Sequence, residues 1–118
     1  MNINIDYQSR VPIYEQIENE IIKYISLGVL KPKDKLPSIR ELAVELSINF
    51  NTVTHAYKDL ENKGIIVTIS TKGYFVPDDV SNTVNLRVDN IILDIKNKMN
   101  ELYKLGIDKE EIIKIISK

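Results

Sequence analysis

Hydrophobic residues recur at steps of three and four along three early stretches of the chain, which is the spacing of a helix with one buried face. The first helix is expected from Pro12 to Gly28, because proline suits a first helical position and glycine often follows the last turn. The second is expected to open at Ser38, where Glu41 completes a capping box, and to end near Leu46. These stretches predict two consecutive amphipathic helices.

A third helical stretch follows after a short Ser/Ile/Asn junction. Asn49 is a good N-cap, and Gly64 marks the end of the pattern. The apolar positions of this stretch, which we expect to face the core, are Val53, Ala56, Tyr57 and Leu60. The second and third helices are therefore separated by a tight turn.

A β-hairpin is expected directly after the third helix. Residues 65–69 are all β-branched, residues 70–73 have turn chemistry, and residues 74–76 form the returning strand before Pro77. Helix, turn, helix and hairpin together predict a winged helix-turn-helix, a shape suited to the DNA major groove. Residues 2–10 form either a small strand or a docked extended arm.

From Val80 onward the apolar positions follow a heptad-like seam, and a short final helix opens at Asp108 with Glu111. A two-helix unit of this size cannot bury its isoleucines alone, so the seam is either an internal core or a dimer interface. We favour the interface. Its predicted residues are Val88, Ile91, Ile92, Ile95, Met99, Leu102, Ile112 and Ile116.

The predicted fold class is mainly α with a small β-hairpin, as a winged helix-turn-helix followed by a two-helix C-terminal dimerisation unit. We expect residues 1–77 to form the DNA-binding domain and residues 78–118 the helical dimerisation tail.

Charge changes the picture, because many DNA-binding domains are strongly basic and this chain has a net charge of −1. Residues 1–79 contain nine Lys and Arg against eleven Asp and Glu. A positive face must therefore be local, and few phosphate contacts imply a modest salt dependence. Its candidate residues are Arg10, Lys31, Lys33, Lys35, Arg40, Lys58 and Lys72.

Several classes of chemistry are excluded by what the sequence lacks. The absence of cysteine excludes disulfides and thiolate metal sites, and the single histidine, His55, forms no metal cluster or triad. We expect no catalytic residues, no metal and no cofactor. Neither a signal-peptide pattern nor an apolar run of about 20 residues is present, so we expect a cytoplasmic location and no membrane partner.

The motifs at residues 11–17, 36–43, 51–60 and 72–76 occur in order and at the right spacing, and they resemble the GntR family of bacterial transcription regulators. The short tail resembles the YtrA-like subfamily, in which it serves dimerisation. In larger members a longer effector-binding domain follows instead. The resemblance implies a DNA contact at Arg40, at the start of the third helix and at the tip of the wing.

The DNA-binding residues that we predict are Ser38, Arg40, Asn49, Phe50, Asn51, Thr52, Thr54, His55, Lys58, Lys72 and Gly73. Several of them have an open alternative: Asn51 caps the helix or reads adenine, the two threonines contact DNA or are inert, and His55 is either solvated or DNA-facing. Arg40 either contacts DNA or pairs with a neighbouring acid, and Asn49 either caps its helix or reads adenine.

We predict a homodimeric repressor that binds a palindromic double-stranded DNA operator. The alternative is a winged helix that serves as a protein-interaction module without specific DNA binding, since a fold alone does not fix function. The sequence leaves the operator, the regulated genes and any small-molecule effector open.

Overall fold

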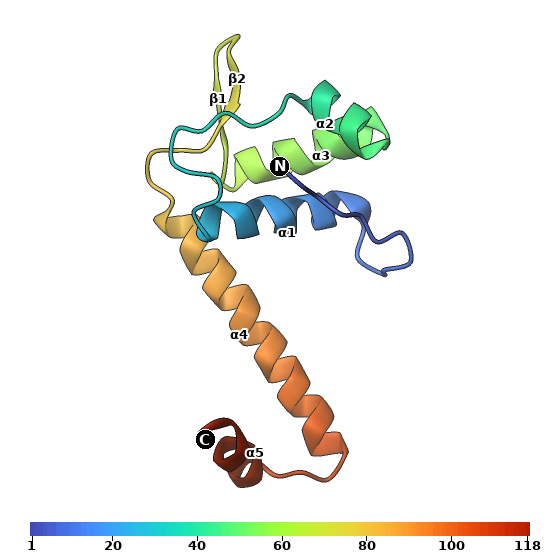
Figure 1. The fold of residues 1–118 in the computed structure, drawn as a ribbon, viewed down its shortest axis with the longest axis vertical. Helices are drawn as coiled ribbons and strands as arrows, with labels where there is room; N and C mark the ends of the chain where they lie inside the picture. Colours follow the sequence, from blue (N-terminus) through green and yellow to red (C-terminus); the bar gives the residue numbers. More distant parts are fainter. The chain divides into compact units, whose positions relative to one another are not determined.

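The computed structural model describes residues 1–118 and divides into two compact units, Met1–Asn85 and Leu86–Lys118. The helices and strands, shown in Figure 1, are α1 (Ile13–Ser26), α2 (Ile39–Leu46), α3 (Phe50–Asn62), β1 (Val67–Ile69), β2 (Gly73–Phe75), α4 (Ser81–Lys104) and α5 (Lys109–Ile116). Five helices and one two-stranded hairpin confirm the predicted fold class. No helix combines the length and the apolar character that crossing a bilayer requires.

The core of the first unit is built around α3, which packs on both α1 and α2. Figure 1 shows α3 lying alongside α1. The apolar stripe predicted for α3 is the buried one. Its residues are Val53, Ala56, Tyr57 and Leu60, and the core residues of α1 and α2 include Ile17, Ile21, Ile25 and Leu42. The three- and four-residue spacing of apolar residues therefore predicted the buried faces of these helices correctly.

The hairpin is shorter than the sequence predicts. β1 and β2 are antiparallel, with Val67 opposite Phe75 and Ile69 opposite Gly73. Ile65 and Ile66 precede the strand and are buried. They belong to the core because the chain turns inward after α3, where the Ile65 N–H donates to the carbonyl of Leu60 at 2.9 Å.

A segment of the loop before α2 pairs with the outer edge of β2. The Lys33 N–H donates to Val76 O and the Leu36 N–H to Tyr74 O, each at 2.9 Å, and the Val76 N–H donates to Asp34 O at 2.8 Å. This pairing ties the wing to the entrance of α2. The sequence indicates only a loop here, so the pairing is a finding of the structure.

The N-terminal residues form a docked extended arm and contain no strand. Ile3 is buried, and the Tyr24 hydroxyl donates to the carbonyl of Asn2. The structure therefore selects the second of the two predicted alternatives.

Tyr57 joins α3 to the residue before α2, because its buried hydroxyl donates to the Pro37 carbonyl at 2.7 Å. Burial raises the pKa of this hydroxyl above its usual value, so it remains a donor.

Tyr57→Phe leaves the carbonyl without that donor, and we expect the free energy of unfolding to fall by about 1–2 kcal/mol. Urea denaturation measures this. The exposed Tyr7, changed to Phe, is the matched control, and equal losses in both variants would contradict the assignment.

Candidate nucleic-acid interface

A capping box fixes the start of α2. The Ser38 hydroxyl accepts from the Glu41 N–H at 3.0 Å, and the Glu41 carboxylate accepts from the Ser38 N–H at 3.1 Å. That backbone hydrogen bond lowers the pKa of Glu41, so the cap stays ionised at neutral pH. Arg40 lies in the first turn of α2 and is exposed.

The turn between α2 and α3 is closed by local hydrogen bonds. Ser47 takes a left-handed conformation with φ 53°, and the Ile48 N–H donates to Ala43 O at 3.0 Å. The side-chain oxygen of Asn49 then accepts from the Asn51 N–H at 2.7 Å. Asn49 therefore caps α3, which is one of the two predicted roles. A contact between Asn49 and a base stays a prediction.

The polar face of α3 is open to solvent along most of its length. Asn51 and Lys58 are exposed, while Thr52 and Thr54 are half-buried. The Thr54 hydroxyl donates to Phe50 O at 3.0 Å, so part of its hydrogen-bonding capacity is used within the helix. Phe50 is 48% exposed at the first helical position, which is unusual for a large apolar side chain.

His55 is exposed, but the Tyr14 ring of α1 covers one face of its imidazole. The two ring centroids are 3.8 Å apart and the rings are inclined by 18°. The sequence predicts a solvated or DNA-facing His55 and does not single out Tyr14. This stack places the N-terminal end of α1 at the edge of the exposed face of α3.

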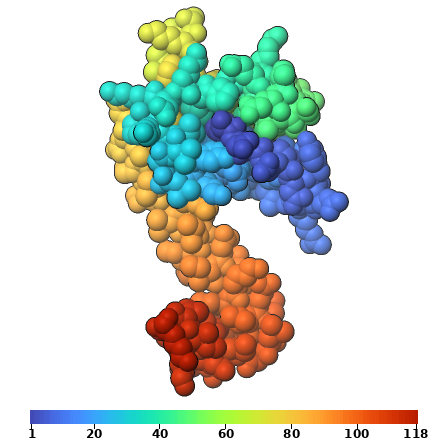
Figure 2. Space-filling model, viewed as in Figure 1, coloured from blue at the N-terminus to red at the C-terminus, as the bar shows by residue number.

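A hollow lies where α2, α3 and the wing converge. Five of the predicted DNA-binding residues line it together: Ser38, Arg40, Phe50, Lys72 and Gly73. Figure 2 shows the wing, in yellow, projecting from the surface beside the green and teal helices of the same unit. Tertiary structure thus gathers residues that are more than 30 positions apart in the sequence.

The turn of the wing depends on two left-handed residues. Ser70 has φ 45° and Gly73 has φ 115°, and the Lys72 N–H donates to Ile69 O at 2.8 Å. A Cβ at Gly73 would also lie 3.4 Å from the Cε of Lys35. Gly73 is therefore required by the backbone, and this requirement is independent of any contact with DNA.

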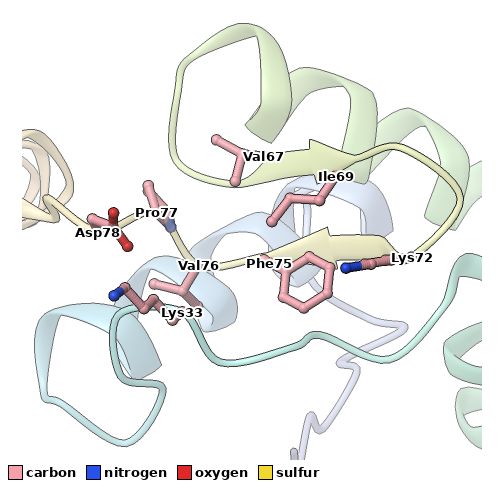
Figure 3. Close-up of a pocket in the computed structure, with 8 residues that line it drawn as sticks. All are labelled: Lys33, Val67, Ile69, Lys72, Phe75, Val76, Pro77 and Asp78. Atoms are coloured by element: carbon pink, nitrogen blue, oxygen red, sulfur yellow. The ribbon is translucent and has the colours of Figure 1, made fainter.

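The outer face of the wing is a shallow apolar hollow, drawn in Figure 3. Its floor is formed by Val67, Ile69 and Phe75. Figure 3 shows the Lys72 side chain extending toward Phe75, with its nitrogen end nearest the ring, and Lys72 is exposed. Lys72 is the only predicted DNA-binding residue that lines this hollow.

The acidic residues of the first unit are largely engaged in local structure. Five of them accept hydrogen bonds from backbone or hydroxyl groups: Asp6, Asp34, Glu41, Glu61 and Asp79. By contrast, eight exposed cations of the first unit take part in none of the three ion pairs of the structure: Arg10, Lys23, Lys31, Lys33, Lys35, Arg40, Lys58 and Lys72. For Arg40 this removes the predicted alternative of an ion pair with a neighbouring acid. These cations are therefore available for phosphate contacts, although the net charge of the chain is negative.

Glu18 is an acidic residue that is buried. It lies on α1 and is 2% exposed, and the ammonium group of Lys63, just after α3, lies 3.4 Å from its Oε1. Lys63 also pairs with Asp59 at 3.1 Å, and Oε2 of Glu18 has no partner. Burial, reinforced by a hydrogen bond to Asp59, raises the pKa of Glu18 to about 7.

The contacts around Glu18 shift the pKa values of Asp59 and Lys63 in opposite directions. The hydrogen bond to Glu18 lowers the pKa of Asp59, and the hydrogen bond to Asp59 raises the pKa of Lys63. Because the pKa of Glu18 is raised and that of Asp59 is lowered, Glu18 takes up a proton before Asp59 does as the pH falls. No local sequence signal distinguishes Glu18 from the other acids of α1.

The predicted residues of the dimer seam fall into three groups by their exposure within one chain. Ile112 is 4% exposed within its own chain, so it packs internally, and its place in an interface stays a prediction. Met99 and Leu102 are half-buried. The seam residues that remain exposed are Val88, Ile91, Ile92, Ile95 and Ile116. A row of exposed β-branched residues of this kind marks an unpartnered surface.

Comparisons with known proteins agree with this geometry. The family described as "Bacterial regulatory proteins, gntR family" matches residues 13–76. The chain is 38% identical to the HTH-type transcriptional repressor YtrA of Bacillus subtilis, over 93% of this chain and 85% of that protein. A GntR family transcriptional regulator from Listeria monocytogenes superimposes with a TM-score of 0.83 at 36% identity, over 96% of this chain and 97% of that one.

Some similar structures were solved with an operator, and AraR(DBD) in complex with operator ORX1 is among them. It is 26% identical, the match covers 64% of this chain and 98% of that one, and the TM-score is 0.57. The part of this chain that is similar to it is therefore of the size of a DNA-binding domain.

Proposed function

The chain belongs to the GntR family of bacterial regulatory proteins, and from this premise we propose that it represses transcription by binding a palindromic operator as a homodimer. It is a regulatory protein and not an enzyme, as the sequence predicted. We assign DNA binding to residues 1–77 and dimerisation to residues 78–118. The AraR operator complex supports double-stranded DNA as the partner.

The observation that carries the proposal is the set of free cations around an amide- and hydroxyl-rich helix. Arg40 and Lys72 border the hollow beside the start of α3, and Lys58 follows on its exposed face. Docked in the major groove, α3 presents Asn51 and Thr54 to base edges, while the cations contact phosphates. Phosphate contacts set the register, and the few amide and hydroxyl groups supply base choice.

Dimerisation rests on the exposed seam of α4. The DNA-binding domain contains more acidic than basic residues, so a single copy binds DNA weakly, and a second copy on the same operator raises affinity through effective concentration. Two-fold symmetry then matches a palindromic site whose half-sites lie about one helical turn apart.

The proposal is tested on an operator obtained by selecting genomic fragments bound by the full chain at low salt. Arg40→Ala and Lys72→Ala each remove one phosphate contact, and we expect each to weaken operator binding about tenfold without changing the thermal midpoint. Fluorescence anisotropy measures affinity.

Lys23→Ala is the matched control, because Lys23 is exposed at the far end of α1 and belongs to no ion pair. Binding that is unchanged in both interface variants would refute their assignment. Failure of the wild-type chain to retain any fragment would refute operator binding itself and favour a protein partner.

A further inference from the structure

We propose that residues 7–11 form a second phosphate-contacting element, with Arg10 as the contact, on the flank of α3 opposite the wing. This inference rests on the proposed DNA binding and names a surface that lies outside the helix-turn-helix and the hairpin. The partner that we propose for residues 7–11 is the DNA strand that runs along that side of the major groove.

The loop is ordered, because the side chain of Gln16 in α1 forms hydrogen bonds with both of its ends, which we call the Gln16 clamp. The Gln16 Nε2 donates to Asp6 O and to Val11 O, and its Oε1 accepts from the Asp6 N–H, each at 2.9 Å. Three further bonds close the loop internally: the Gln8 N–H donates to Asp6 Oδ1 at 3.0 Å, the Val11 N–H to Ser9 Oγ at 3.1 Å, and the Ser9 N–H to Asp6 O at 3.3 Å. An ordered loop loses less entropy when it binds.

The clamp presents Arg10 to solvent. Arg10 is exposed and belongs to none of the ion pairs. The nearest acid along the chain, Asp6, already accepts a hydrogen bond from the loop backbone. A guanidinium held in this way suits bidentate contact with a phosphate.

The Tyr14–His55 stack places this loop next to the recognition helix. Tyr14 follows the loop by one helical turn, and its ring lies on His55 at 3.8 Å. The residues of α3 on the side of the wing are Phe50, which borders the hollow with Lys72, and Glu61, which accepts from Thr68 of β1.

At 100° per residue, Asn51 and Lys58 project between His55 on one side and Phe50 and Glu61 on the other. The exposed face of α3 is therefore bordered by the base of the loop on one side and by the wing on the other. The major groove is likewise bordered by two phosphate backbones. With α3 in the groove, Lys72 lies toward one strand and Arg10 toward the other.

The test compares salt dependence, because each lost phosphate contact lowers the slope of log K against log salt by about 0.9. We expect Arg10→Ala to weaken binding roughly fivefold and to lower the slope by about 1, equally for operator and unrelated DNA. Arg10→Lys should keep the slope, and Lys23→Ala, with the same loss of charge, should leave both values unchanged. Circular dichroism melts show whether each variant is folded.

Gln16→Ala tests the clamp without changing the charge. We expect it to weaken binding about as much as Arg10→Ala, and to add little in the Arg10→Ala background, because both changes remove the same contact. Full additivity of the two changes would overturn the clamping role of Gln16.

The outcomes separate the two proposals. If Lys72→Ala lowers the slope while Arg10→Ala behaves like Lys23→Ala, the loop is not a DNA contact and the inference fails while the proposed function stands. If the wild-type chain binds no DNA at any salt concentration, the proposed function fails and the inference fails with it.

Discussion

The double variant Ile92→Lys/Ile95→Lys should be monomeric and should bind the operator roughly 10²–10⁴-fold more weakly than the wild-type chain. Both side chains lie on the predicted seam and are about half exposed in the isolated chain, so lysine can be accommodated without disturbing the fold of either unit. In a dimer, the same positions would bring four ammonium groups into an apolar interface. The desolvation of unpaired charges opposes association strongly.

Loss of the dimer affects binding because each DNA-binding domain has few cations. A single domain bears the full entropic cost of association, whereas the second domain of a dimer binds at the effective concentration set by its connection to the first. Light scattering measures the mass, and anisotropy with one and two half-sites measures the affinity. The advantage of two half-sites over one should disappear in the variant.

Asn97→Lys is the matched control, because Asn97 is exposed and lies on the side of α4 opposite Ile92. It should remain dimeric and bind the operator like the wild-type chain. A dimer that persists in the double variant would place the interface elsewhere. A monomeric variant with undiminished operator affinity would show that pairing is not needed for recognition.

Much of the first unit could be predicted because its signals are local. Ser38 and Asn49 are caps whose partners lie two or three residues away, and the periodic apolar positions of α3 need only one helix to be read. The run that contains Ile65 and Ile66 was misassigned because β-branched residues suit both a strand and a buried plug. Only the direction of the chain after α3 distinguishes the two.

The parts that could not be predicted depend on contacts between distant residues. Gln16, Tyr14 and Glu18 look like ordinary members of an amphipathic helix, but each meets a partner at least five positions away. Their roles follow from how α1 lies against α3 and the N-terminal arm. Likewise, the charged loop residues 33–36 have no strand-like pattern, and their pairing is imposed by β2.

Glu18→Gln should stabilise the protein by about 3 kcal/mol at pH 8 and by progressively less as the pH falls toward 4.5. In the unfolded chain Glu18 ionises near 4.5, whereas in the folded chain its pKa is about 7. The folded state therefore binds the proton more tightly, and wild-type stability falls as the pH rises from 4.5 to 7. Above pH 7 the full cost of the buried charge is present, and glutamine removes it.

The neighbouring groups do not mask this effect. The lowered pKa of Asp59 affects stability only as the pH falls toward 3.8 and below, and the raised pKa of Lys63 only above about 10.5. The amide that Glu18→Gln introduces is neutral at every pH, so it carries no cost of a buried charge. Between pH 4.5 and 7 the difference in stability between wild type and Glu18→Gln therefore reports on Glu18.

Urea denaturation at pH 5, 6, 7 and 8 measures the difference, with Glu15→Gln as the control. Glu15 lies on the same helix and is exposed, so its loss should change stability by less than about 0.5 kcal/mol at every pH. A wild-type chain whose stability is flat from pH 5 to 8 would mean that Glu18 is ionised throughout and fully compensated by Lys63. In that case Glu18→Gln should destabilise the contact between α1 and α3, because Lys63 would lose a charged partner.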